Sequence, residues 1–141
     1  IQEMNMDVIH TILDNNWIPV VSTIGYDEKG NCYNINADTV AAAIAGELKA
    51  EALVSMTDIV GLLRDKDDES TLIQKVFISE TPALIAEGII SGGMIPKIDS
   101  MTQAIRNGCQ KAFIIDGRVP HSILMELLTD EGAGTMVKGV D

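Results

Sequence analysis

Hydrophobic and polar residues follow one another along the chain with the periods of short helices and short strands. A helix over residues 5–15 is predicted by apolar residues on one face, at Met6, Ile9, Ile12 and Leu13. The same reasoning predicts helices over residues 36–48, 81–87, 94–106 and 121–128. Apolar runs predict strands over residues 17–24, 53–58, 112–116 and 134–137, and a short strand or hairpin over 71–78. Strands that alternate with helices favour an α/β fold with a largely parallel sheet and helices on both faces.

Capping and turn residues mark where several of these elements begin. Asn36 is a typical N-cap, and Asp38 follows in the first helical turn, where an acid complements the helix dipole. Pro82 suits the first position of a helix, because its missing N–H is not needed there. The polar stretch 27–31 contains a glycine, which predicts a hairpin turn within residues 25–33.

The composition narrows the possible classes of function. Among 141 residues, 10 are Lys or Arg and 21 are Asp or Glu, which gives a formal net charge of −11. Nucleic acid and anionic membrane surfaces both attract basic proteins, so neither is expected as a partner. Apolar residues make up 46% of the chain and aromatic residues 4%, which predicts a folded domain with an aliphatic core. No apolar run reaches the roughly 18 residues of a membrane span, and no signal peptide is visible.

Cysteine and histidine usage predicts a cytoplasmic protein without a tightly bound metal. Cys32 and Cys109 lie 77 residues apart, and His10 and His121 are distant from both in the sequence. Two cysteines do not make a disulfide framework, and this spacing does not match a zinc site. We therefore expect two reduced thiols.

The first stretch with candidate chemistry is residues 58–63, at the end of a predicted strand. In open α/β sheets, ligands bind beyond the carboxyl ends of the strands. Asp58 in that place suits a ribose or a metal-bound phosphate, and Gly61 lets the backbone approach a flat ligand. The alternative is a strand-to-loop turn that Asp58 caps. The pattern alone leaves these two interpretations equally open.

The second stretch is residues 88–97, where Gly92 and Gly93 precede a predicted helix and Lys97 lies in its first turn. Backbone N–H groups at a helix start attract phosphate. A lysine beside them supplies the kind of positive charge that stabilises a transferring phosphoryl group. The spacing does not match a Walker A loop. The alternative is a helix–helix turn with a surface lysine.

The third stretch is residues 34–38, Asn-Ile-Asn-Ala-Asp. Asn34 and Asn36 point to the same side of an extended chain, where their amides suit a small polar substrate. Asp38 is placed to orient neighbouring lysines. The alternative is a capped helix in which Asp38 complements the dipole. The acidic run 65–69 lacks the spacing of a calcium-binding EF-hand loop, so a solvated loop is expected there.

Five motifs stand in a fixed order along the chain: residues 34–38 (Asn-Ile-Asn-Ala-Asp), 57–63 (Thr-Asp-Ile-Val-Gly-Leu-Leu), 87–97 (Glu-Gly-Ile-Ile-Ser-Gly-Gly-Met-Ile-Pro-Lys), 116–121 (Asp-Gly-Arg-Val-Pro-His) and 129–136 (Thr-Asp-Glu-Gly-Ala-Gly-Thr-Met). Together they resemble the carboxyl-terminal half of the acetylglutamate kinases, within the amino acid kinase family. The resemblance covers nearly the whole chain. It implies a three-layer αβα sandwich with a mainly parallel central sheet. Residues 1–50 would be the remainder of the amino-acid-binding lobe, and residues 51–141 the nucleotide-binding lobe.

The resemblance implies a reaction and assigns roles to individual residues. The reaction is transfer of the γ-phosphoryl group of ATP, accompanied by Mg²⁺, to the side-chain carboxylate of N-acetyl-L-glutamate in arginine biosynthesis. Lys97 matches a catalytic lysine, and Asp38 matches the acid that organises the catalytic lysines. Asn34 matches a substrate-binding asparagine, and Asn36 is assigned to the same role. The residues that match ATP-holding stretches are Asp58, Ile59, Val60, Gly61, Leu62, Leu63, Ile89, Ile90 and Ser91.

The last two motifs resemble the arginine-inhibited branch of the family. By that likeness His121, Glu126 and Gly132 are candidates for a feedback site for L-arginine, in which Glu126 would accept the guanidinium. The alternative is that Glu126 is a solvent-facing helix residue. The family's amino-terminal glycine loop and second catalytic lysine have no counterpart here. We therefore expect a nearly inactive fragment of a homo-oligomeric enzyme.

Two other functions stay open on the sequence. One is a nucleotide- or amino-acid-sensing module without chemistry, because a fold does not fix a function. The other is a related kinase that acts on carbamate, aspartate or glutamate. The motifs at residues 34–38 and 92–97 favour acetylglutamate among these acids.

Overall fold

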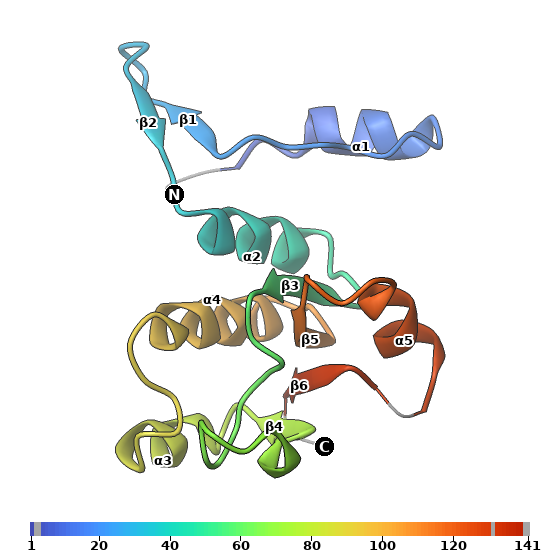
Figure 1. The fold of residues 1–141 in the computed structure, drawn as a ribbon. Coiled ribbons are helices and arrows are strands. Elements are labelled where there is room, and N and C mark those ends of the chain that lie inside the picture. Colours follow the sequence, from blue (N-terminus) through green and yellow to red (C-terminus); the bar gives the residue numbers. More distant parts are fainter. Residues whose placement is uncertain (2–3, 131, 140–141) are drawn as a thin grey trace.

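A four-stranded sheet forms the centre of the computed structural model, which describes residues 1, 4–130 and 132–139 (Figure 1). Its strands lie in the order β3 (Leu53–Thr57), β5 (Lys111–Asp116), β6 (Gly134–Lys138) and β4 (Lys75–Phe77). β3 pairs with β5 in parallel, and so does β6 with β4, whereas β5 and β6 are antiparallel. The prediction of a mainly parallel central sheet is confirmed.

Helices cover both faces of this sheet. α2 (Ala37–Glu47) and α4 (Met94–Arg106) lie on one side, and α5 (Ser122–Leu128) lies on the other (Figure 1). The three-layer α/β fold is therefore confirmed. Short segments complete this part of the molecule, namely η1 (Glu69–Thr71) and α3 (Thr81–Ala86). None of the helices in the described ranges is long and apolar enough to cross a membrane.

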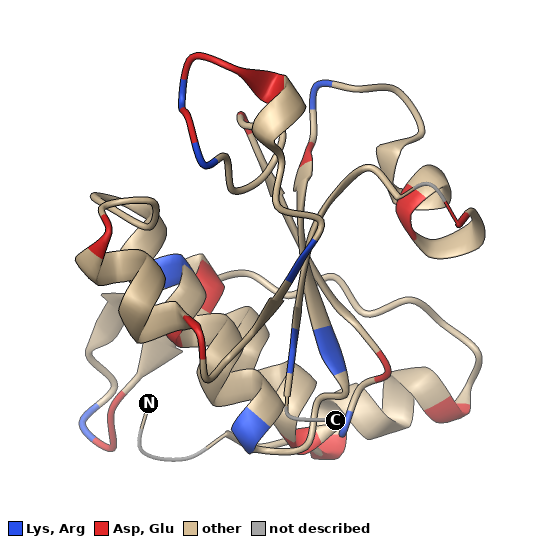
Figure 2. Ribbon diagram, turned by 90° about the horizontal axis from the view of Figure 1, so that it is seen from below, with Lys and Arg blue, Asp and Glu red and all other residues tan. Residues whose placement is uncertain are grey.

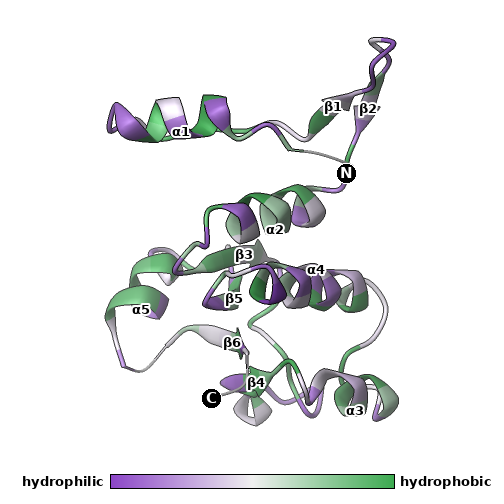
Figure 3. Ribbon diagram, turned by 180° about the vertical axis from the view of Figure 1, so that it is seen from behind, coloured by the Kyte–Doolittle hydropathy of each residue, from purple (hydrophilic) through white to green (hydrophobic). Residues whose placement is uncertain are grey.

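The core is aliphatic, as the composition predicts. Residues 112–116 of β5 are all buried, because helices cover both faces of the sheet at this strand. On the α4 side the core joins Ile98 and Met101 of that helix to Ile114 and Val137 of the sheet. Burying one such side chain stabilises the fold by roughly 1.5–3 kcal/mol. Hydrophobic residues also run along α5, where Leu124 and Leu128 are exposed (Figure 3).

A seam of small residues joins α2 to α4. Ala42 and Ala45 of α2 pack with Ala104 of α4, and all three are buried. Near the carboxyl end of the seam, a Cβ built on Gly46 would lie only 2.7 Å from the Cβ of Asn107. Small side chains let the two helix backbones approach closely. The two helices run side by side in the same direction. Their first turns consequently meet at one end.

The amino-terminal part stands apart from the sheet (Figure 1). It contains α1 (Asp7–Asp14) and an antiparallel hairpin of β1 (Ile24–Tyr26) and β2 (Cys32–Asn34). The predicted strand over residues 17–24 is wrong except at its last residue. A strand needs a partner to bond with, and residues 17–22 have none among the described residues. Their apolar side chains stay in solvent, and Val20 is 95% exposed.

Two other expectations differ in detail from the structure. The segment 71–78 holds the end of η1 and the three-residue β4, with an isolated bridge between Leu63 and Leu72 instead of a hairpin. The last helix begins at Ser122, because His121 has a φ of 64°, outside the helical range. Asn36 caps α2 as predicted, since its side chain accepts a hydrogen bond from the Thr39 amide at 3.2 Å.

One carboxylate organises the turn of the hairpin. Asp27 accepts hydrogen bonds from the Lys29 and Asn31 amides, the Asn31 side chain and the Tyr33 hydroxyl, at 2.8–2.9 Å. The bond from the Asn31 side chain leads these effects, which together lower the pKa of Asp27 from 3.8 to about 2. Each bond favours the ionised carboxylate, so protonation of Asp27 weakens the turn.

We predict an acid-sensitive hairpin. A depressed carboxyl pKa adds stability that is present above the unfolded value of 3.8 and is lost as the pH falls through about 2. A titration of the Asp27 carboxyl carbon by NMR should have its midpoint near 2, and Asn31→Ala should raise that midpoint. Lys29→Ala keeps the backbone amide and should leave it unchanged. Equal midpoints in the unaltered and Asn31→Ala chains would contradict this account.

We also predict that Gly134 cannot carry a side chain. A Cβ at this position would lie 2.0 Å from the Ile114 carbonyl oxygen, so β5 and β6 would have to separate. Gly134→Ala should lower the free energy of unfolding by about 3 kcal/mol, measured by urea denaturation. The matched control is Gly139→Ala, just beyond the same strand, whose Cβ would meet Ile105 at an ordinary 3.4 Å. Equal denaturation midpoints would refute the prediction.

Candidate functional site

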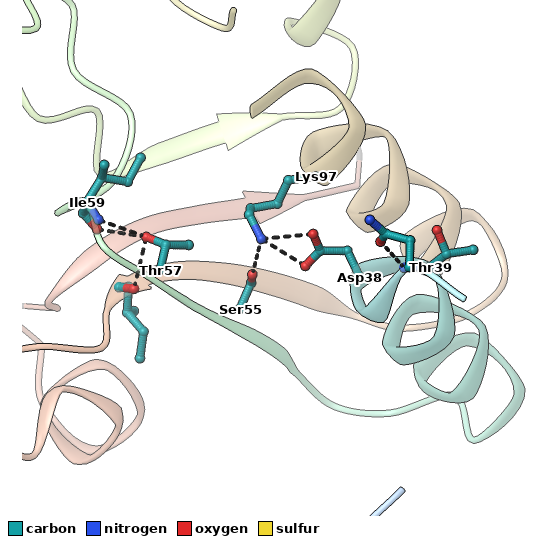
Figure 4. A network of polar contacts seen from close by, with 8 residues as sticks. Asp38, Thr39, Ser55, Thr57, Ile59 and Lys97 are labelled. Carbon is teal, nitrogen blue, oxygen red and sulfur yellow. Dashed lines mark hydrogen bonds and ion pairs between the residues drawn. The ribbon is translucent and has the colours of Figure 1, made fainter. Parts of the chain in front are cut away.

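The ammonium group of Lys97 lies where α2, β3 and α4 meet (Figure 4). Its Nζ atom donates to both carboxylate oxygens of Asp38, at 2.8 and 3.0 Å, and to the Ser55 hydroxyl at 3.0 Å. An ammonium has three protons, so these acceptors fix its position. The structure thus brings together the two predicted catalytic residues and adds Ser55, which the sequence did not single out.

The packing of the helices produces this contact. Asp38 is in the first turn of α2 and Lys97 is in the first turn of α4, and the small-residue seam aligns the two starts. Ser55 lies on the same face of β3 as Thr57 (Figure 4). The Lys97 side chain is 18% exposed and that of Asp38 34%. Partial exposure weakens the ion pair as a source of stability, because solvent screens it. Its main effect is to orient the cation.

A pocket opens beside this ammonium group. It has a volume of about 180 Å³, and its wall includes Asp38, Ser55, Lys97 and Ser100. Pockets that enclose a small-molecule ligand usually measure roughly 300–1,000 Å³. This pocket is therefore large enough for a carboxylate or a phosphoryl group and too small for a nucleotide.

The predicted nucleotide-binding segment 58–63 follows the carboxyl end of β3. The Thr57 hydroxyl accepts from the Ile59 amide at 3.1 Å and donates to the Ile59 carbonyl at 3.0 Å, which folds the chain into a turn (Figure 4). Asp58 and Ile59 are exposed, while Val60 and Leu63 are half-buried. Leu62 is 2% exposed and belongs to the core, so only its backbone is available to a ligand.

The predicted nucleotide-binding residues 89–91 lie close to that segment. Ile90 is fully buried in the same core as Leu62, and Ile89 packs against it. The Ser91 hydroxyl accepts a hydrogen bond from Lys66 of the charged loop at 3.1 Å. That loop holds charges of both signs (Figure 2). The expectation of free N–H groups at the start of α4 is only partly correct, because the Met94 and Ile95 amides donate to the Ser91 and Gly92 carbonyls.

The predicted substrate-binding asparagines have different surroundings. Asn36 uses its side-chain oxygen to cap α2, as the structural alternative predicted. Asn34 ends β2, is exposed, and accepts a long hydrogen bond of 3.4 Å from the Thr23 hydroxyl. Both side chains are exposed and use only their oxygen in these contacts, so the amide nitrogen of either one is available to a ligand.

A second ion pair, which the sequence did not reveal, lies at the same edge of the sheet. Asp116 ends β5 opposite Thr57 of β3, and the structure buries it. It accepts three hydrogen bonds at 2.8–2.9 Å from Arg118, through the amide, Nε and Nη2. The Arg118 side chain, first by hydrogen bonding, lowers the pKa of the Asp116 carboxyl below its usual range. The Asp-Gly-Arg sequence at residues 116–118 contained a signal for this ion pair, because a turn at the glycine brings the residues on either side of it into contact.

The three candidate arginine-site residues are only partly brought together. The Glu126 carboxylate of α5 accepts a hydrogen bond from the Ala133 amide, and Gly132 lies beside it. His121 stands at the start of α5 and is exposed. Glu126 is therefore not simply a solvent-facing helix residue, since it already holds the loop before β6.

The thiols and acids of the described residues include no group of three that could hold a metal ion. Cys32 is exposed and Cys109 is buried, and both are free, as expected. Burial raises the pKa of the Cys109 thiol, which keeps it protonated and unreactive.

Relatives with known names match most of this chain. An acetylglutamate kinase from Brachyspira hyodysenteriae is 56% identical over 136 residues, which are 96% of this chain and 47% of that protein. One from Archaeoglobus fulgidus is 50% identical over 135 residues, again 96% of this chain and 47% of that protein. The chain spans about half the length of the curated relatives it matches.

The fold and the family agree with these matches. A crystal structure of N-acetylglutamate synthase from Neisseria gonorrhoeae, complexed with coenzyme A and L-arginine, aligns with a TM-score of 0.87 and 26% identity. The alignment covers 97% of this chain and 31% of that one. The sequence profile of the amino acid kinase family matches residues 1–116. The matched segment contains Asp38, Ser55 and Lys97, and this chain belongs to the amino acid kinase family.

Proposed function

We propose that this chain carries the Lys97 part of the active site of an acetylglutamate kinase. The reaction is transfer of the γ-phosphoryl group of ATP to the side-chain carboxylate of N-acetyl-L-glutamate. The names of relatives at 50–56% identity support this reaction. The observation that carries the proposal is the ammonium group of Lys97, fixed by Asp38 and Ser55 at the wall of a pocket of about 180 Å³.

Phosphoryl transfer depends on positioning and on neutralising charge, because donor and acceptor are both anions. In the proposed reaction Lys97 faces the oxygens of the phosphoryl group as it passes from ATP to the carboxylate. Asp38 and Ser55 hold the ammonium in place beforehand, so only one of its three hydrogen bonds has to be exchanged for a phosphoryl oxygen when charge develops. Asp38 also carries a negative charge that repels a misplaced anion.

The nucleotide part of the proposal uses residues 58–63 and 89–91. Exposed Asp58 and the Ser91 hydroxyl offer side-chain contacts, whereas Leu62 and Ile90 offer only their backbone. Mg²⁺ would enter with ATP and be held by its phosphates in this proposal, and it would supply positive charge to the transferring group.

The division into lobes is a further part of the proposal. Residues 1–50 belong to the amino-acid-binding lobe, with Asn34 as a substrate contact, and residues 51–141 form the nucleotide-binding lobe. Support comes from the separate position of the hairpin and from the exposed side chains of Trp17, Ile18 and Val20. Apolar surface of that kind is covered by further protein in a working enzyme, from the same chain or from another subunit.

Feedback inhibition by L-arginine is the last part of the proposal. Glu126 and Gly132 lie together between α5 and β6, and His121 begins that helix. A guanidinium that binds Glu126 would compete with the Ala133 amide for its carboxylate. Binding of arginine would therefore shift the loop that leads into β6. Inhibition of turnover by added L-arginine tests this part.

The two alternatives predict different results in one assay. A sensing module binds ATP or an amino acid and transfers no phosphate. A related kinase transfers phosphate to carbamate, aspartate or glutamate. Measuring turnover with each acid, in the protein as its gene encodes it, separates the three. The oriented Lys97 favours a kinase over a sensor, because a sensor has no need of a charge aimed at a transferring group.

We predict that Lys97→Met in the gene-encoded protein lowers kcat by about 10²–10³-fold, since one preorganised donor is lost. KM for ATP should change much less, because Lys97 acts mainly in the transition state. A coupled assay of ADP release measures both constants.

The matched control is Lys49→Met, because Lys49 is an exposed lysine just after α2 and outside the pocket. This variant should keep the unaltered rate. A Lys97→Met protein that turns over at the control's rate would remove Lys97 from the proposed chemistry.

A further inference from the structure

Thr135 of β6 is a polar residue in the core with both of its hydrogen-bonding capacities in use. It is fully buried, with 0% exposure. Its hydroxyl accepts from the Leu62 amide at 2.9 Å and donates to the Ile73 carbonyl at 2.7 Å. A threonine hydroxyl has one proton to donate and lone pairs to accept. Thr135 therefore joins two backbone segments that lie 73 and 62 residues away in the sequence.

These bonds form a junction at the nucleotide-binding segment. The Ile73 amide donates to the Leu62 carbonyl at 2.8 Å, so the two segments joined by Thr135 are also bonded to each other. The Met136 amide, next to Thr135, donates to the Gln74 carbonyl at 2.9 Å. The loop after β3 is thus attached to β6 and to the chain that enters β4.

The glycine before Leu62 fits the same junction. Gly61 has a φ of +145°, which side chains rarely adopt. A Cβ on Gly61 would lie 2.6 Å from the Thr135 hydroxyl oxygen and 2.8 Å from Leu72 Cδ1. The loop therefore passes directly over the hydroxyl, and only glycine permits that approach.

We propose that the Thr135 hydroxyl is the positioning group for the nucleotide-binding loop 58–63, an inference that rests on the proposed function. The Leu62 side chain is buried in the core, so this part of the loop presents only its backbone to a nucleotide. Without the hydroxyl, the buried Leu62 amide loses its acceptor, and a buried donor without a partner is costly. The loop then moves toward water, and its backbone leaves the position that binds ATP.

The test compares Thr135→Val with Thr135→Ser in the full chain. Valine keeps the shape and removes the hydroxyl, while serine keeps the hydroxyl. We measure the Kd for Mg·ATP by calorimetry and the hydrogen exchange of the amides in residues 58–63. Thr135→Val should weaken binding about tenfold, the effect of one lost hydrogen bond to a buried partner, and should speed exchange at Leu62. Thr135→Ser should restore both values to nearly those of the unaltered chain.

Two further variants separate positioning from general stability. Phe113→Leu makes a cavity in the neighbouring strand β5, at a buried residue on the other face of the sheet from the cluster that contains Leu62, so it lowers stability without changing the packing of the loop. It should leave the Kd unchanged at a temperature where the chain is folded. Gly61→Ala keeps Thr135 and displaces the loop from the other side, so it should weaken binding as Thr135→Val does. If the Thr135→Val chain does not fold, the Kd of Gly61→Ala is the measurement that tests the inference.

The outcomes distinguish this inference from the proposed function. Failure of the unaltered chain to bind Mg·ATP would contradict the proposed function, and the exchange rates would then decide alone whether Thr135 holds the loop. The inference would be overturned if the unaltered chain binds Mg·ATP and both Thr135→Val and Gly61→Ala bind it with the same Kd as the unaltered chain. An equal loss of affinity in Phe113→Leu would also overturn it, because the effect would then be one of stability.

Discussion

The ion pair between Lys97 and Asp38 joins the starts of α2 and α4, and Ser55 connects it to β3. The chain carries a formal net charge of −11, so positive charge at a binding site has to be supplied locally. The small residues between the two helices make this possible, because they align the first turns at one end. The Asp38 carboxylate and the Lys97 ammonium together carry no net charge. The pair therefore serves to hold the ammonium in a fixed place at the wall of the pocket.

Around the ion pair, buried side chains anchor the loops, and the backbone of these loops is what remains available to a ligand. Leu62 and Ile90 point into the core and anchor the loops that would hold a nucleotide, which leaves their backbone for the ligand. Thr135 and Gly61 then set where one of these loops lies. The amino-terminal segment is different, because Ile18 and Val20 are 88% and 95% exposed and are attached to no sheet. The sheet and the helices packed on it thus support one another, whereas the described amino-terminal segment leaves its apolar side chains in solvent.

The sequence predicted those features that depend on local order. The caps and the mainly parallel sheet followed from periodicity and turn chemistry. The roles of Asp38 and Lys97, which lie 59 residues apart, came instead from the resemblance of the ordered motifs to a known family. The strand over residues 17–24 failed, because composition shows that a segment can pair and does not show that a partner is present. Ser55 and Thr135 were missed for a related reason. Their partners lie 42 to 73 residues away, and an isolated hydroxyl residue in an apolar strand gives no sign of what it will contact.

The central claim is that Asp38 acts through Lys97 as one unit, and a double-mutant cycle tests it most directly. Turnover is measured in the gene-encoded protein with Asp38→Asn, with Lys97→Met and with both changes. If Asp38 serves to place the ammonium of Lys97, the double variant should be no slower than the Lys97→Met variant alone. Losses of rate that multiply, as for two independent residues, would contradict the account.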